Sequence, residues 1–203
     1  MNQQKVWGAI APSWSNFRQK PQDEVLTLAQ TWKQGKILDI GCGNCRNLLP
    51  FAEKTFECYG IDFSKEMLEQ AIIFTKKKNF KVNLKKASMD KLPFKDECFD
   101  YCICLASLHH LDSNNKRKKA LSEMHRVLKK DGHVLLMVWN KLQFKFLLAK
   151  KDSFIPWNLK GKPYERHYHL FTANELQKLV KEEKFLILNK KTAKNIAFLL
   201  KRE

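Results

Sequence analysis

The chain has 203 residues, of which 44% are hydrophobic, and this length and composition suit one domain with a sizeable core. Lys and Arg number 38 against 21 Asp and Glu, which gives a formal net charge of +17. No run of about 18 apolar residues is present, and the N-terminus has no signal-peptide core. We therefore expect neither a membrane span nor a secretory leader.

The excess of positive charge favours a polyanionic partner, with nucleic acid as the first choice. Two basic clusters, residues 75–86 and 114–119, are candidates for part of its footprint. An ordinary solvated surface in a lysine-biased proteome is the alternative. The six cysteines lie mostly within apolar patterns, which indicates free thiols in a reducing, cytoplasmic compartment.

Short apolar runs alternate with segments of helical period up to residue 140, which predicts βα units and a parallel sheet. Ser64 is the predicted N-cap of one helix. Two helical segments, residues 7–17 and 22–32, precede the first strand, and the former is predicted to act as a lid. The expected strands are 36–40, 57–62, 81–87, 99–106 and 131–139, the last entered through a hairpin-like turn, and the expected helices are 47–54, 64–78 and 115–128.

The rhythm changes after residue 140. Residues 141–171 carry many aromatic side chains, two prolines and one glycine, and are too irregular for a βα unit. They are predicted to form a substrate-facing insertion. Thr172 and Glu175 form a capping-box pattern for a helix that ends near residue 184. Residues 185–190 and 195–201 are predicted to close the sheet as an antiparallel pair.

The segment Lys36–Leu48 places Asp39 at the end of a strand and two glycines, Gly41 and Gly43, before a helix. Glycines let a ligand approach the backbone closely, and a helix N-terminus offers free N–H groups. Asp62 ends the second strand 19 residues after Gly43, a spacing that suits a carboxylate bound to two ribose hydroxyls. Together these features predict an adenosine-type ligand, with turn glycines and a capping aspartate as the alternative.

The dinucleotide fingerprint lacks its third glycine here, because residues 44–47 read NCRN. Asp39 would also repel a pyrophosphate, whereas it suits a ligand that carries an ammonium or a sulfonium. Charge complementarity therefore favours S-adenosylmethionine over NAD.

The cysteine pairs Cys42/Cys45 and Cys102/Cys104 raise the question of a metal or redox site. A zinc site would need four converging sulfurs, and a redox site a reactive thiolate pair. Cys102 and Cys104 lie on one face of a strand and fit a buried apolar surface. We expect no metal.

Four segments resemble the successive motifs of class I S-adenosylmethionine-dependent methyltransferases: LDIGCGNCRNL, YGIDFS, LPFKDECFDYCICLASLHHL and LSEMHRVLKKDGHVLLMVW. IAPSWSNFRQKP, ASLHHL, VWN, DSFIPW and ERHYHLF are similar to one branch, the tRNA wobble-uridine methyltransferases that esterify 5-carboxymethyluridine to 5-methoxycarbonylmethyluridine. The resemblance covers residues 7–171.

The resemblance implies an α/β fold with a Rossmann-like, seven-stranded, mostly parallel sheet and helices on both faces. A helical lid and an aromatic-rich insertion would be added to it. Residues 1–203 would form a single methyltransferase domain. Its parts would be N-terminal helices in 1–34, a cofactor-binding core in 35–140, the insertion in 141–171, and a helix and strand pair in 172–203.

The resemblance also implies a set of residues that contact the cofactor. The acid at the end of the first strand would reach the methionine amine, the following loop would pass under it, and the acid of the second strand would hold the ribose. The predicted residues are Asp39, Gly41, Cys42, Gly43, Asp62, Phe63, Ser88, Met89, Leu105 and Ala106. Two positions depart from the family pattern: Cys45 replaces a glycine, so its side chain must point away from the methionine or narrow the pocket, and Ser88 replaces an acid that contacts adenine.

The implied reaction moves a methyl group from a sulfonium to a carboxylate oxygen. A carboxylate is already an anion at pH 7, so no general base is needed. A cationic clamp is needed instead, and Arg18 and Arg166 are the candidates. His110, rather than His109, is predicted to face the uridine. Tyr168 and His169 are predicted to stack on or hydrogen-bond the flipped base.

The implied partners are the tRNA anticodon loop and a small zinc-binding activator protein, which would form a heterodimer along the sheet edge. A small-molecule O- or C-methyltransferase of the same fold is the main alternative. A binding module that has lost catalysis is a third possibility, suggested by Cys45 and Ser88.

Overall fold

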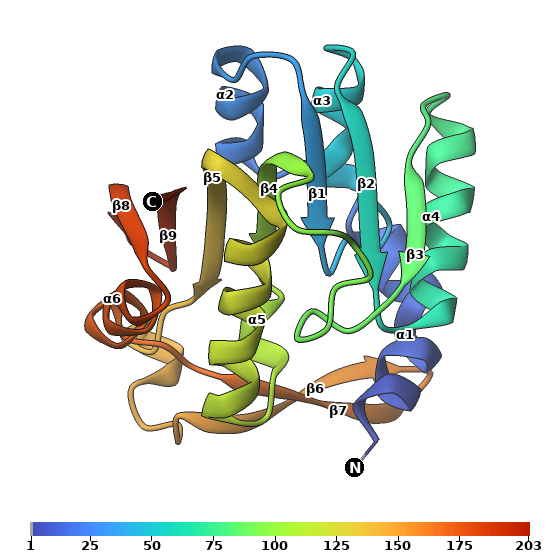
Figure 1. The fold of residues 1–203 in the computed structure, drawn as a ribbon. Coiled ribbons are helices and arrows are strands. Elements are labelled where there is room, and N and C mark those ends of the chain that lie inside the picture. The colour runs from blue at the N-terminus through green and yellow to red at the C-terminus, as the bar shows by residue number, and fades with distance from the viewer. Residues whose placement is uncertain (1) are drawn as a thin grey trace.

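A computed structural model describes residues 2–203, and its centre is a seven-stranded sheet (Figure 1). The strand order is β3-β2-β1-β4-β5-β9-β8, in which β1 to β5 pair in parallel and β9 and β8 pair antiparallel. The predicted mostly parallel sheet with helices on both faces is confirmed. The strands are β1 (Lys36–Ile40), β2 (Glu57–Asp62), β3 (Asn83–Lys86), β4 (Phe99–Leu105), β5 (Leu128–Trp139), β8 (Phe185–Thr192) and β9 (Asn195–Arg202).

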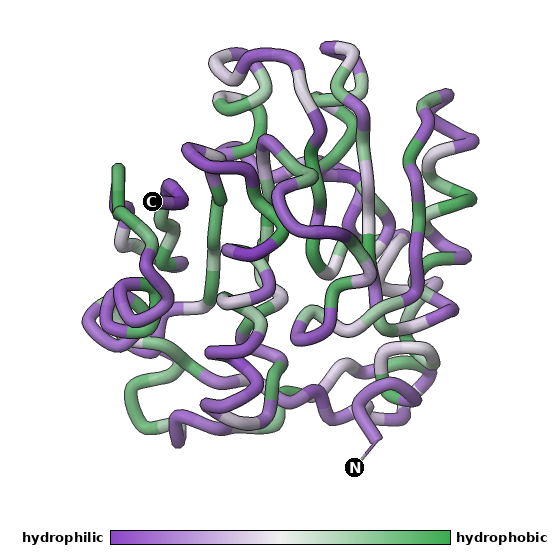
Figure 2. The backbone as a smooth tube through the Cα atoms, in the orientation of Figure 1, coloured by the Kyte–Doolittle hydropathy of each residue, from purple (hydrophilic) through white to green (hydrophobic). Residues whose placement is uncertain are grey.

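The strands bury side chains on both faces because successive residues point to opposite sides. In β4, Cys102 and Cys104 pack on one face with α5 and α6, whereas Ile103 and Leu105 pack on the other with α2, α3 and α4. Both cysteines are fully buried, as predicted. Figure 2 shows the hydrophobic residues gathered along these strands. The helices are α1 (Gln3–Phe17), α2 (Asp23–Thr31), α3 (Leu49–Ala52), α4 (Lys65–Lys77), α5 (Asn114–Val127) and α6 (Ala173–Glu182), with 3-10 segments at Arg46–Leu48, Leu108–His110 and Phe144–Phe146.

Helix starts follow the capping signals of the sequence. The Ser64 hydroxyl accepts a hydrogen bond from the backbone N–H of Met67, and Thr172 does the same for Glu175. The capping box at Thr172 is only half formed, because the Glu175 side chain binds His169 and Lys151 instead. No helix among residues 2–203 is both long and apolar enough to cross a membrane.

Several predicted boundaries are wrong. The helix expected over 47–54 is a 3-10 turn followed by the short α3. The expected turn into the fifth strand is a bend inside β5, which begins at Leu128. Asp131 there adopts a φ of 63°, and the register with β4 shifts between Phe99 and Tyr101.

The region 141–171 forms no βα unit, as expected, but it contains a regular β-hairpin that was not predicted from the sequence. β6 (Asp152–Leu159) pairs antiparallel with β7 (Lys162–His169) as a separate two-stranded sheet. Lys160 and Gly161, both at positive φ, form the two-residue turn that fits the strand twist. Burial alternates along β6, but the matching period-2 pattern in the sequence covers only Ile155, Trp157 and Leu159, since Phe154 is exposed.

His169 anchors this hairpin. Its Nδ1 lies 2.9 Å from an Asp152 carboxylate oxygen on β6, and its Nε2 lies 2.8 Å from a Glu175 oxygen on α6. Burial opposes the charge on Glu175, but hydrogen bonds from His169 and Lys151 outweigh it and lower the pKa of Glu175 to about 2. The imidazole therefore joins β6, β7 and α6.

The N-terminal helix α1 packs on α4 and on the hairpin (Figure 1). Its Trp14 ring lies directly over Gly43, where an added Cβ would come 2.8 Å from the ring. Gly43 also has a φ of +54°. The Trp14 ring therefore occupies the space that a side chain at position 43 would need, so α1 and the loop after β1 can pack this closely only with glycine there.

We expect Gly43→Ala to lower the unfolding temperature, because the methyl group strains the backbone and displaces Trp14. Gly161→Ala is the matched control: its φ is +77°, but nothing lies within 4 Å of the added Cβ. Thermal unfolding should show a larger loss for Gly43→Ala. Equal losses would mean that the contact with Trp14 contributes nothing.

We expect His169→Ala to reduce the free energy of unfolding by about 1–3 kcal/mol, because two carboxylates lose a buried hydrogen-bond partner. Lys151→Ala removes only the half-exposed ion pair with Glu175 and should cost about 0.5 kcal/mol or less. Urea unfolding measures both. A His169→Ala loss no larger than that of Lys151→Ala would disprove the anchoring role.

Candidate functional site

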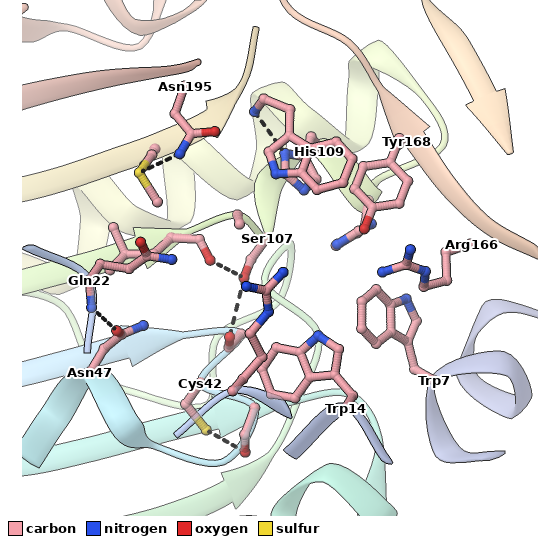
Figure 3. A pocket seen from close by; sticks show the side chains of 18 of the residues that line it. Trp7, Trp14, Gln22, Cys42, Asn47, Ser107, His109, Arg166, Tyr168 and Asn195 are labelled. Carbon is pink, nitrogen blue, oxygen red and sulfur yellow. Dashed lines mark hydrogen bonds between the residues drawn. The ribbon is translucent and has the colours of Figure 1, made fainter. Parts of the chain in front are cut away.

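A cavity of about 350 Å³ opens where β1, β2 and β4 end, the position at which open parallel sheets hold ligands. The loop after β1 and the ends of β2 and β4 form its floor. Helix α1, the 3-10 segment Leu108–His110 and strand β7 close its sides (Figure 3). Segments that are distant in sequence therefore meet around one space.

Asp62 holds the floor of the cavity together. Its carboxylate accepts hydrogen bonds from the backbone N–H groups of Gly43 at 3.1 Å and Ser64 at 3.0 Å. Burial raises the pKa of Asp62 to about 6, although the backbone N–H groups act against that rise. The N–H groups of Gly41 and Cys42 both donate to the Ile61 carbonyl, which bends the loop across the end of β2.

Asp39 lies just behind the cavity wall. It is 1% exposed, and one carboxylate oxygen has no hydrogen-bond partner. Burial raises the pKa of Asp39 to about 7, with the nearby charge of Arg46 acting in the opposite direction. A buried acceptor without a donor is uncommon and suits a cationic ligand.

Most of the residues predicted from the sequence meet at this cavity. Asp39, Ser88 and His169 do not line it. The predicted residues that line it are Arg18, Gly41, Cys42, Gly43, Asp62, Phe63, Met89, Leu105, Ala106, His110, Arg166 and Tyr168.

Two of the three absences correct the prediction. Ser88 is exposed and its hydroxyl donates to Asp90, so it points away from the cavity. His169 lies on the opposite face of β7 from Arg166 and Tyr168, because strand residues alternate in direction. Its ring nitrogens face Asp152 and Glu175.

Cys45 does not narrow the cavity. It is fully buried against the apolar cluster of Leu48 and Phe51, and it adopts a φ of 65° despite carrying a side chain. The cavity wall contains Cys42 but not Cys45. Residues 2–203 contain no group of three or more His, Cys, Asp or Glu side chains that could hold a metal.

Both histidines after β4 line the cavity, and hydrogen bonds define their tautomers. His110 Nδ1 lies 2.8 Å from the His167 carbonyl oxygen and therefore carries a proton. His109 Nδ1 accepts from the backbone N–H of Trp139 at 3.1 Å, so its Nε2 carries the proton, and that atom is buried without a partner. Burial lowers the pKa of His110 to about 3 and that of His109 far below its usual value. Both rings are neutral at pH 7.

Arg166 projects from β7 into a cage of aromatic rings. The guanidinium carbon lies 5.6 Å from the centre of the Trp7 ring, 5.2 Å from Trp157 and 5.3 Å from Tyr168 (Figure 3). The Nε of Arg166 and the Nε1 of Trp7 are buried donors without acceptors. With His109 Nε2, three N–H groups on the side chains of this wall lack a partner in residues 2–203.

Sequence reasoning missed several residues of the wall. Arg46 follows the glycine loop and stacks 5.2 Å from the Trp14 ring, and burial lowers its pKa to about 10. Arg46 could have been predicted from its position directly after the glycine loop, whereas no local sequence pattern marks Lys145 or Lys194. The basic side chains of the wall are Arg18, Arg46, Lys145, Arg166 and Lys194, and Asp62 is its only acidic one among the described residues.

Comparisons with known proteins identify the family and the fold of the chain. Residues 38–136 match the family model described as a methyltransferase domain. A putative methyltransferase of Encephalitozoon cuniculi is 32% identical over 174 residues, which are 82% of this chain and 77% of that protein. The tRNA (carboxymethyluridine(34)-5-O)-methyltransferase of Saccharomyces cerevisiae is 31% identical over 168 residues, which are 78% of this chain and 58% of that protein.

A solved structure shares the fold. The S-adenosylmethionine-dependent methyltransferase of Clostridium acetobutylicum superposes with a TM-score of 0.72 over 93% of this chain and 90% of that one, at 18% identity. The order of the motifs, the sheet topology and the sequence relatives agree. The chain belongs to the class I S-adenosylmethionine-dependent methyltransferases.

Proposed function

We propose that the protein is a tRNA methyltransferase that esterifies the carboxylate of 5-carboxymethyluridine at the wobble position. The observation that carries the proposal is the charge imbalance of the cavity wall, which among the described residues contains five basic side chains and one carboxylate, that of Asp62. Three N–H groups on the same wall lack acceptors. A wall of this kind suits an anionic substrate with many acceptor atoms, such as a carboxymethyl uracil in RNA, better than a neutral phenol or quinone.

The cofactor half of the cavity fits S-adenosylmethionine. When bound, this cofactor supplies a methyl group on a cationic sulfur. Asp39 does not line the cavity, so it would balance the ammonium group by its charge, through water or the backbone between them. Asp62 would accept from the ribose hydroxyls, because its carboxylate is already oriented by two backbone N–H groups. The remaining predicted contacts are Gly41, Cys42, Gly43, Phe63, Met89, Leu105 and Ala106; Ser88 is withdrawn from the set.

The substrate half needs to position a carboxylate rather than to remove a proton. Arg166 and Arg18 would bind one carboxylate oxygen and leave the other free to attack. His110, with a pKa of about 3, and the equally neutral His109 fit a reaction without a general base. Orientation and exclusion of water would then supply most of the rate, up to roughly 7–11 kcal/mol in favourable cases.

The tRNA anticodon loop fits the net charge of +17 and the aromatic wall of the cavity. Tyr168 stacks on Trp139 with ring centres 4.3 Å apart, and an extruded base could pack against such rings. We also propose the zinc-binding activator as a partner at the β3 edge. Ile72 and Ile73 on the neighbouring α4 are 45% and 58% exposed there. The free cysteines favour action in the cytoplasm.

Nucleoside mass spectrometry tests the proposal. The protein, with and without the zinc protein, is incubated with S-adenosylmethionine and tRNA that carries either unmodified or carboxymethyl-bearing wobble uridine. We expect the methyl ester only from the carboxymethyl-bearing tRNA. Arg166→Ala should lose turnover by at least about tenfold while keeping cofactor affinity, and Arg166→Lys should recover part of it. Methyl transfer to small acids or quinones but never to tRNA would instead establish a small-molecule methyltransferase.

The affinity for S-adenosylmethionine should fall as the pH drops below about 7. Asp39 is neutral below its pKa of about 7, and the ammonium group of the ligand favours the ionised form, so binding releases a proton. Asp62, with a pKa of about 6, acts in the same direction. Calorimetric titrations between about pH 5.5 and 8.5, in buffers of different ionisation enthalpy, measure both the affinity and the proton release.

Asp39→Asn is the control for that pH dependence. In this variant, the pH profile of the cofactor affinity still contains the titration of the ligand itself. The raised pKa also means that the ligand-free protein loses stability as the pH rises from about 4 through 7. The variant should therefore unfold at a higher temperature than the wild type at pH 8 while binding the cofactor more weakly. An unchanged affinity profile in Asp39→Asn would remove this residue from the cofactor site.

A further inference from the structure

The mouth of the cavity is built by two segments that the proposed chemistry does not use. One is the loop that follows β5, residues 141–150, and the other is the turn between β8 and β9. The Asn140 side-chain amide donates to the Ala193 carbonyl at 2.8 Å and ties the two together. The Lys141 amino group donates to the carbonyls of Phe146 and Leu147 and folds the loop on itself.

Each segment brings one lysine to the wall of the cavity. Lys145 lies 4.8 Å from the centre of the Trp139 ring and 4.5 Å from that of Phe146. Lys194 lines the same mouth. Within residues 2–203, neither ammonium group has a carboxylate within ion-pair distance, whereas nine other lysines do.

The two charges are close enough to affect each other. Burial and the charge of Lys194 both lower the pKa of Lys145. Two like charges held together at an opening, without a protein counter-ion, favour an anion from outside the chain. A phosphate group meets this need, since lysine binds phosphate as a point charge.

An exposed apolar residue lies in the same loop as Lys145. Phe144 precedes Lys145 in the chain and is 92% exposed. Exposed aromatic rings and unpaired cations on one surface are the combination that single-stranded nucleic acid binds, through base stacking and phosphate contacts. The other exposed apolar residues of the same loop are Leu142, Leu147 and Leu148.

We propose that Lys145 and Lys194 bind the backbone phosphate of the nucleotide adjacent to the one in the cavity, and that Phe144 stacks on the base of that neighbour. The inference rests on the proposed tRNA substrate. It explains why the mouth is cationic as well as the interior: the target base is covalently linked to a phosphate that must lie at the opening when the base is inside. Continuity of the lysines with the cavity wall favours RNA over a lipid surface as the occupant.

The test measures RNA binding apart from methyl transfer. Lys145→Gln/Lys194→Gln is compared with Lys33→Gln/Lys54→Gln, which removes the same charge from two exposed lysines that precede β1 and β2, at the end of the sheet opposite to the cavity. Fluorescence polarisation with an anticodon stem-loop RNA, over a range of salt concentrations, gives the affinity and its salt dependence. Phosphatidylserine vesicles serve as the second probe, and calorimetry with S-adenosylmethionine reports whether each variant is folded.

We expect the mouth variant to bind the RNA at least about tenfold more weakly than the control, with a salt slope smaller by about 0.7, because one phosphate on a single strand is no longer neutralised. Phe144→Ser should weaken binding roughly fivefold or more without changing the salt slope, because stacking involves no counterion release. Where turnover is measurable, the ratio of kcat/KM on RNA to kcat/KM on free 5-carboxymethyluridine should fall in the mouth variant.

Two results would overturn the inference. One is equal RNA affinity of the mouth variant and the Lys33→Gln/Lys54→Gln control, and the other is a loss confined to vesicle binding. The proposed function fails separately, since it fails when no methyl ester forms on tRNA. In that case the mouth variant can still lose RNA affinity. This result would support the phosphate site while the proposed esterification is rejected.

Discussion

The carboxylate of Asp62 accepts two backbone N–H groups, one from the glycine loop and one from the start of α4, and the cavity depends on this arrangement. It joins the ends of β1 and β2 to the first turn of α4 in one place. Because the acceptor is buried, the loss of either donor would leave charge without compensation. Asp62 thus fixes the conformation of the loop on one side, and the Trp14 ring of α1 packs on the other side at Gly43.

The two halves of the cavity are electrostatic opposites. On the cofactor side, Asp39 is an acceptor without a donor. On the substrate side, Trp7, His109 and Arg166 have donors without acceptors. Protein interiors rarely leave such groups without partners, and under the proposed function ligand atoms would satisfy both deficits. A cationic methyl donor and an anionic acceptor would satisfy the two sides and meet between them.

The β6–β7 hairpin is a separate two-stranded sheet that brings side chains into the cavity beside the main sheet. His169 fixes its inner end to α6, and this leaves Arg166 and Tyr168 directed into the cavity on the other face. His169, which was predicted to contact the substrate base, therefore holds the hairpin in the position from which Arg166 and Tyr168 line the cavity. The same hairpin packs on α1, so the two coverings of the site are in contact with each other.

The sequence was sufficient to predict the order of strands and helices up to β5, the glycine loop, and the closeness of the Asp39 and Asp62 carboxylates. These features depend on local periodicity and on spacings within one βα unit. The hairpin could also have been predicted, from its two-residue turn and from the partly alternating apolar residues of β6. The many aromatic residues of the region made this pattern less clear. Other features were decided only by the tertiary structure. Which of two adjacent histidines has an unpaired nitrogen depends on the backbone of Trp139, and the position of His169 depends on Asp152 and Glu175. Lys145 and Lys194 meet because chain packing brings two distant loops together, and no local pattern records a contact of that kind.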